Sequence, residues 1–253
     1  MLFFANALVF IALVAGVGAR MGFDLSVPTD EATWTCLKDA VPANDVFAIV
    51  RVFRNVGQVD TNAADTLISG SKAGVRDLSA YIFPCIQSAP SSVANNVTCG
   101  SADDQVSASL NYLESNGVYI KGYNDDKSTS KDPVLNKIWL DIEDEVPSKY
   151  FSEDISQNTD YLSQVVSSLE GHGVTVGIYT TLTYWENIMD NVEGYGDHAL
   201  WYPRYDAENS YDFFQPFADF TIDSLMVKQT GGNVDTCGLS QVDSDYSETA
   251  GPI

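Results

Sequence analysis

The chain has 253 residues, and its 13 Lys and Arg against 35 Asp and Glu give a net charge of −22. Such a charge repels phosphate backbones and anionic lipid, which argues against nucleic acid as a partner and against stable membrane association. With 45% hydrophobic and 19% charged residues, the composition is that of a protein with a large core and not of a disordered acidic tail. We expect a compact, acidic monomer.

The first 19 residues form an apolar segment that ends in small residues, which is typical of a signal peptide. The mature chain would begin at Arg20, and the protein would be secreted or held in the lumen of an acidic vesicle of the lysosome or phagosome type. A buried first strand or a membrane anchor is the alternative interpretation of this segment. Residues 20–253 are predicted to form one domain, because barrels of alternating strands and helices commonly use that length.

Strand-like and helix-like segments alternate along the mature chain, which predicts an α/β protein built from βα units. Strands are expected at 21–24, 47–53, 78–83, 138–142, 174–179, 199–205 and 225–229, with an eighth near Val242. Helices are expected at 62–73, 102–115, 153–169 and 183–191. Because helices become sparse after Leu182, we expect a single irregular TIM-like barrel with about five helices.

Four cysteines without the Cys-x-x-Cys spacing of zinc sites predict two disulfides in an exported protein. Three pairings are possible. Cys85 and Cys99 flank a loop rich in Pro, Ser and Asn, which favours a local bridge and leaves Cys36 to pair with Cys237. The same loop holds an N-glycosylation sequon at Asn96, which is used only in a eukaryotic secretory route.

The segment IWLDIEDE at 138–145 is a predicted strand that ends in Asp141 and Glu143. Residues two apart on a strand share a face, so their α-carbons would be about 6.6 Å apart at a rise of about 3.3 Å per residue. Paired carboxyls catalyse glycoside hydrolysis, with retention at separations of about 5–5.5 Å and inversion at about 6.5–9.5 Å. The alternative is a solvated rim of acids without function.

Barrel enzymes place their chemistry at the carboxyl ends of their strands. Asp24 ends the first predicted strand and Asp243 follows the last, so both are expected near Asp141 and Glu143. Candidate substrate-binding residues at or near strand ends are Tyr81, Tyr179, Tyr202, Tyr205 and Gln229. The tyrosines could stack on sugar faces, although core packing is the commoner role of a tyrosine.

The segments MGFDLS, IWLDIEDE, GIYTTLTYW, LWYPRY, VKQTGG and VDSDYS resemble, in this order, the signature of the family 25 glycoside hydrolases, the Chalaropsis-type lysozymes. The similarity runs from about residue 21 to about residue 248. The export signal and cysteines resemble the eukaryotic branch of amoebae and nematodes. The resemblance implies a flattened barrel of eight strands and about five helices. It also implies cleavage of the β-1,4 bond between N-acetylmuramic acid and N-acetylglucosamine in bacterial peptidoglycan.

By this resemblance Glu143 is the general acid and Asp141 its partner in the Asp-x-Glu motif, while Asp24 and Asp243 are the acids of the first and the last strand. The bacterial members of the family usually have Trp-Gln in the late strand and Asp-x-Asn in the next motif. This chain has Lys-Gln at 228–229 and Asp-Ser-Asp at 243–245, so that Asp245 takes the amide position. The segments 85–99 and 119–132 have no clear counterpart in the family.

The proton donor must keep its proton, and repulsion by Asp141 and Asp24 is expected to raise the pKa of Glu143 and to favour an acidic optimum. Asp141 could attack the sugar directly, or it could orient the N-acetyl oxygen of the substrate to do so. We favour substrate assistance, which gives net retention.

Other classes of function remain possible. A chitinase-like glycosidase would need an Asp-x-x-Asp-x-Asp-x-Glu array, which 137–143 lacks, and a silent sugar-binding homologue would keep the fold without activity. Asp243 and Asp245 could bind calcium, but the glycine-containing loop of such sites is missing. His172 and His198 are isolated and make no zinc ligand set. We predict neither a metal nor a cofactor.

Overall fold

The computed structural model describes residues 19–42, 45–87, 98–123, 132–144, 149–249 and 251–253. All but the last residue of the predicted signal peptide lie outside these residues, and so does the sequon at Asn96. None of the helices in the described ranges is long and apolar enough to cross a bilayer.

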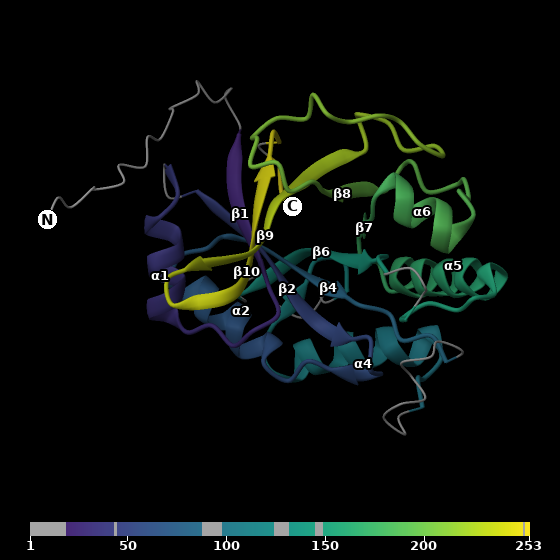
Figure 1. Cartoon of the computed structure of the whole chain (residues 1–253). Helices are drawn as coiled ribbons and strands as arrows, with labels where there is room; N and C mark the ends of the chain where they lie inside the picture. The colour runs from purple at the N-terminus through teal and green to yellow at the C-terminus, as the bar shows by residue number, and fades with distance from the viewer. Residues whose placement is uncertain (1–18, 43–44, 88–97, 124–131, 145–148, 250) are drawn as a thin grey trace, which may run out of the picture.

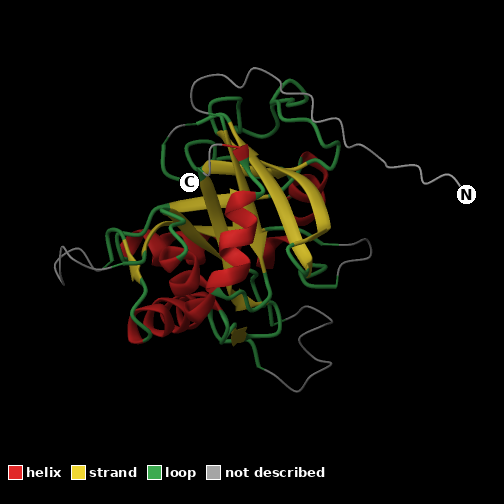
Figure 2. Ribbon diagram, turned by 90° about the vertical axis from the view of Figure 1, so that its left-hand side faces the viewer, coloured by secondary structure: helices red, strands yellow, loops and turns green. Residues whose placement is uncertain are grey.

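Eight strands close into a barrel, which confirms the predicted α/β barrel (Figures 1 and 2). Around the ring they are β1 (Arg20–Leu25), β2 (Val46–Arg54), β4 (Asp77–Ile82), β6 (Val134–Asp141), β7 (Val176–Tyr179), β8 (Ala199–Pro203), β9 (Leu225–Thr236) and β10 (Leu239–Ser247). Neighbours are parallel except β10, which is antiparallel to both β9 and β1. The short strands β3 (Gln58–Val59) and β5 (Tyr119–Ile120) pair with β2 and β6 from outside the ring.

Five helices are present among the described residues and lie around the outside of the strands (Figures 1 and 2). They are α1 (Glu31–Asp39), α2 (Ala63–Lys72), α4 (Ala102–Ser115), α5 (Ile155–Gly171) and α6 (Leu182–Met189). The last four match the predicted helices, whereas α1 was not predicted as a segment. Its signal is the N-cap Asp30, whose carboxylate accepts from the Thr33 amide at 2.8 Å.

The wall of β8, β9 and β10 is covered by loops, as the late helix-poor sequence predicts. Three phenylalanines of the segment between β8 and β9, Phe214, Phe217 and Phe220, are buried against the outside of the barrel. The hairpin β9–β10 is longer than the predicted strand 225–229. Gly231 and Gly232 interrupt the apolar pattern there, so this strand continues through a sequence that is typical of a loop.

The barrel interior is largely aromatic. Its buried apolar cluster is separate from the larger one outside the strands and consists of Phe47, Ile49, Tyr81, Trp139, Tyr179, Trp201, Val227 and Ile253. The indoles of Trp139 and Trp201 pack edge to face at 5.8 Å between ring centroids. This filled interior leaves the end of the barrel as the place where polar side chains can meet a substrate.

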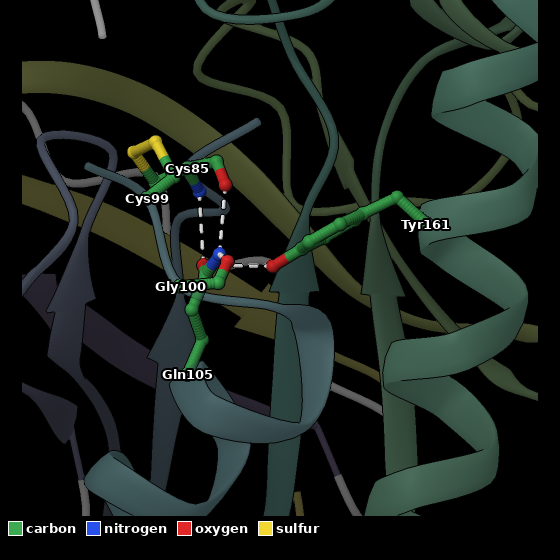
Figure 3. Close-up of a disulfide and its surroundings, with 5 residues drawn as sticks. All are labelled: Cys85, Cys99, Gly100, Gln105 and Tyr161. Carbon is green, nitrogen blue, oxygen red and sulfur yellow. Dashed lines mark hydrogen bonds between the residues drawn. A yellow bond between two sulfur atoms is a disulfide. The ribbon is translucent and has the colours of Figure 1, made fainter. Parts of the chain in front are cut away.

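Both disulfides have the predicted pairing. The bond between Cys36 and Cys237 joins α1 to the turn of the β9–β10 hairpin. The bond between Cys85 and Cys99 closes the predicted loop, whose residues 88–97 are not described. Beside it the buried Gln105 donates to the carbonyls of Cys85 and Gly100 and accepts from the Cys85 amide and the Tyr161 hydroxyl (Figure 3).

Candidate active site

The carboxyl end of the barrel brings together acids that are far apart in sequence. Asp24 on β1 lies directly opposite Asp243 on β10 in the strand register. Asp141 is the last residue of β6 and pairs with Tyr179, the last residue of β7. Because parallel strands end at one edge of the barrel, these side chains gather as the sequence predicts.

The amide of Gln229 on β9 connects this group. Its Nε2 donates to Asp24 Oδ2 at 2.7 Å and to Asp243 Oδ2 at 3.1 Å. Its Oε1 accepts from the hydroxyls of Tyr179 and Tyr205, each at 2.8 Å. The amide therefore has donors facing the acids and its acceptor facing the tyrosines, and the side chain is 2% exposed.

Glu143 lies two residues beyond the end of β6 at Asp141. Its negative charge raises the pKa of Asp141, so the two acids are neighbours in the folded chain. Beyond the strand the buried Asp144 carboxylate accepts from the backbone amides of residues 149–151 at 2.7–3.0 Å. These bonds fix Asp144 next to Glu143, which is half-buried, with its Oε2 3.5 Å from the Tyr179 hydroxyl.

Burial raises the pKa of Glu143 to about 7, and the negative charge of Asp243 adds to the effect. The carboxyl therefore keeps its proton in mildly acidic water. The sequence predicted that repulsion by Asp141 and Asp24 raises this pKa. That prediction is wrong about the main cause, because the loss of hydration has the larger effect and the repelling charges are those of Asp243 and Asp144. Burial raises the pKa values of Asp141 and Asp24 as well, which lowers the negative charge that they present to Glu143.

One cation lies close to these acids. The positive charge of Arg51 on β2 lowers the pKa of Asp141, against the larger effects of burial and of Glu143. Its guanidinium is fixed by two bonds to Asp60 Oδ2, at 2.9 and 3.0 Å, and by one to the Ser26 carbonyl at 3.2 Å. Sequence reasoning missed Arg51, although a charge inside the apolar run VFAIVRVF was a detectable signal.

The four candidate tyrosines have three different environments. Tyr179 and Tyr205 belong to the site through Gln229, and the Tyr205 side chain is 61% exposed, which leaves its ring available to a sugar face. Tyr81 is inside the barrel, edge to face with Trp201 at 6.1 Å. Tyr202 lies on the outer face of β8 against Phe213, Phe214 and Phe217, so it is not part of the site, because neighbouring strand residues face opposite sides.

Nothing in the described part of the chain forms a metal-ligand cluster of three or more His, Cys, Asp or Glu. A cavity of about 860 Å³ lies at the other end of the barrel, at the starts of β7, β8 and β9, away from the acids.

Comparison with known proteins agrees with this geometry. The family model described as "Lysozyme-like protein 1" matches residues 16–123 and 123–229. A probable GH family 25 lysozyme 2 of Dictyostelium discoideum is 33% identical over 239 residues, which is 94% of this chain and 96% of that protein. Lysozyme-like protein 5 of Caenorhabditis elegans is 31% identical over 248 residues, covering 96% and 98%.

Among solved structures, a family GH25 lysozyme from Aspergillus fumigatus has the same fold, with a TM-score of 0.63 and 17% identity over 90% of this chain and 93% of that one. The family model and the two curated relatives cover most of the chain, and the relatives exceed 30% identity. The chain is therefore a member of family 25 of the glycoside hydrolases.

Proposed function

We propose that this protein is a lysozyme, an N-acetylmuramidase that hydrolyses the β-1,4 bond between N-acetylmuramic acid and N-acetylglucosamine in bacterial peptidoglycan. One observation carries the proposal: Glu143, with its raised pKa, lies with Asp24, Asp141 and Asp243 at the carboxyl end of a family 25 barrel. An acid cluster of this kind serves glycoside hydrolysis.

Glu143 is the proton donor to the leaving sugar oxygen. A general acid must hold its proton until the transition state, and a carboxyl with a pKa of about 7 does so at mildly acidic pH. Asp24 and Asp243 are held by the Gln229 amide and supply the negative potential that stabilises the positive charge developing on the sugar ring. The exposed ring of Tyr205 offers a stacking surface beside this group.

Asp141 assists through the substrate. Its carboxyl is only 6% exposed, and among the described residues no donor reaches its buried Oδ1. A buried carboxyl oxygen without a donor can accept a hydrogen bond from the acetamido N–H of the bound sugar and orient that group. The acetamido oxygen then forms the bond to that carbon, and water opens the resulting ring with net retention.

The substrate is tested with purified peptidoglycan and with chitin, followed by mass analysis of the new reducing ends. We expect reducing N-acetylmuramic acid from peptidoglycan and no release from chitin. Reducing N-acetylglucosamine from chitin would favour a chitinase-like enzyme. Binding to peptidoglycan without cleavage would favour a sugar-binding homologue, and either result would overturn the proposal.

The stereochemical course is tested separately by proton NMR of the product in the first minutes of reaction. We expect the β-anomer to appear first and then to equilibrate. A substrate with an electron-poor trifluoroacetamido group should react more slowly, because its amide oxygen is the weaker nucleophile. Initial α-anomer would exclude retention, and equal rates for the two acyl groups would favour direct attack by Asp141.

We also propose that the protein acts as a monomer outside the cytosol, either secreted or in an acidic vesicle. Its two disulfides suit an oxidising compartment. Mass analysis of the native protein should find an N-terminus at Arg20 and a glycan on Asn96. A native N-terminus at Met1 would contradict the predicted signal peptide.

A further inference from the structure

Asp245 on β10 is a fully buried carboxyl that the mechanism above does not use. It is 0% exposed, and in the strand register it faces Gln229 on β9 and Gly22 on β1. The indole N–H of Trp201 donates to its Oδ1 at 2.9 Å. Its Oδ2 is also buried, and no amide, hydroxyl or amine of the described residues donates to it. A buried carboxylate oxygen without a donor is costly.

Besides the Trp201 indole, the carboxyl of Asp24 lies within hydrogen-bonding range of Asp245. Asp24 is itself 6% exposed and already accepts from the Gln229 amide at its Oδ2. Two buried carboxyls in contact cannot both be ionised at moderate cost, whereas a single proton on the Asp245 oxygen that lacks a donor lets this oxygen donate to Asp24.

The charged neighbours increase this need for a proton. The negative charges of Asp243 and Asp141 raise the pKa of Asp24, and the negative charge of Asp243 raises the pKa of Asp245. The cation Arg51 is bonded to Asp60 and acts on Asp141. Burial is the largest cause that raises the pKa values of Asp24 and Asp245 well above their ordinary range, and for Asp24 the charge of Asp245 comes next, followed by that of Asp243.

We propose that Asp24 and Asp245 hold one proton between them, and that Asp245 is a positioning residue whose carboxylic acid donates a hydrogen bond to Asp24. Asp24 is then held on one side by Gln229 and on the other by Asp245, which fixes the carboxylate in the direction that the reaction uses. The catalytic part of this inference rests on the proposed function, but the shared proton does not.

The first test compares the pH dependence of thermal stability in wild type and Asp245→Asn. A carboxyl whose pKa is raised by folding stabilises the protein most below its unfolded pKa of about 3.9, and this stability is lost as pH rises toward the folded pKa. The amide does not titrate. The Tm of Asp245→Asn minus that of wild type should therefore increase between pH 4.5 and 7, by roughly 3 °C per pH unit.

Asp235→Asn is the matched control, because it makes the same chemical change at an exposed position on the neighbouring strand β9. Its Tm difference should stay constant over the same range. A constant difference for Asp245→Asn as well would mean that Asp245 is ionised in the folded protein, and it would overturn the proposal.

The second test counts the proton directly by infrared spectroscopy at pH 7. Each of Asp245→Asn and Asp24→Asn should lose the same carbonyl band of a protonated carboxyl, since the introduced amide becomes the donor and the remaining acid ionises. The double variant should lose no further band. Loss of a second band in the double variant would show two separate protons, and no loss in either single variant would show none.

Activity provides the third test. Asp245→Asn keeps a donor toward Asp24 and should exceed Asp245→Leu in kcat by roughly 10-fold or more, with little change in KM. Equal kcat values in the two variants would refute the positioning role. If wild type does not cleave peptidoglycan at all, the proposed function fails, while the stability and infrared tests still decide whether the proton is shared.

Discussion

Glu143 has the surroundings that a proton donor needs. It lies just beyond β6, half-buried, with the Tyr179 hydroxyl near its Oε2 and negative charge from Asp243, and its pKa is about 7. The protonated fraction of such a group falls as pH rises through 7, so the chemical step should slow over that interval.

Replacing Glu143 by Gln removes the acidic proton but keeps the shape of the side chain. We expect kcat on a soluble muropeptide to fall by about 10²–10⁴-fold, while Tm and the affinity for the sugar change little. Stopped assays with product analysis measure kcat, and calorimetry measures Tm and the affinity for the sugar. Glu153→Gln, at an exposed position before α5, is the control and should behave as wild type. Wall lysis by Glu143→Gln at the wild-type rate would contradict the assignment.

Tyr205 combines an exposed ring with a hydroxyl that is bonded to Gln229. Tyr205→Ala removes the stacking surface and should raise KM for peptidoglycan fragments by roughly 3- to 10-fold. Tyr205→Phe keeps the ring and should keep the wild-type KM to within about 2-fold, with any loss appearing in kcat through the Gln229 network. If both variants have the same KM, the ring does not contact the sugar.

The Gln105 side chain connects helices α4 and α5 to the ends of the Cys85–Cys99 loop. Gln105 is 2% exposed and bonds the backbone of Cys85 in both directions, the Gly100 carbonyl and the Tyr161 hydroxyl (Figure 3). The disulfide restrains the ends of this loop covalently, and Gln105 joins them to the helices.

Gln105→Ala leaves several buried polar groups without partners. We expect the free energy of unfolding to fall by about 2–4 kcal/mol, because each such group costs about 1–3 kcal/mol. Chemical denaturation with the disulfides intact measures the change. Gln164→Ala, at an exposed position on α5, should change it by less than about 0.5 kcal/mol. A loss for Gln105→Ala as small as that would mean that water replaces the bonds freely.

The whole molecule has a net charge of −22 and a sequence pI of about 4.1. Bacterial walls are often anionic, so encounter between the protein and a cell should be slowed by repulsion near neutral pH. Acidification reduces the surface charge and at the same time keeps Glu143 protonated. Both effects favour activity on cells in mildly acidic medium.

Lysis of whole cells should therefore peak at mildly acidic pH, and added salt should increase the rate near neutral pH by screening over a Debye length of about 8 Å at physiological strength. Turbidity assays across pH and salt measure this. A small soluble muropeptide is the control, since it should show the loss of activity near pH 7 with little dependence on salt. Lysis that rises steadily toward alkaline pH and is suppressed by salt would contradict both the charge argument and the role of Glu143.

Much of the barrel was predictable, since short apolar runs with polar ends mark parallel strands wherever they lie in the chain. Helix α1 was missed because its buried side is short, with Trp34 and Leu37 as its buried residues. The second half of β9 was missed because glycines and polar residues there are paired to β10 and face partly outward. Tyr202 was misplaced because the face on which a strand residue lies depends on register, which one strand alone does not reveal.

The family, the alternation of strands and helices and the identities of the acids could be predicted from the sequence, because these depend on local pattern and on the order of motifs. The cysteine pairing was favoured by the sequence and confirmed by the structure. The tertiary structure decided which of those groups meet. Gln229 joins Asp24 to Asp243 only because β9, β10 and β1 are neighbours in the closed barrel. The proton affinities of Glu143 and Asp245 were likewise decided by folding, since burial is the largest cause of each pKa shift and burial exists only in the packed molecule.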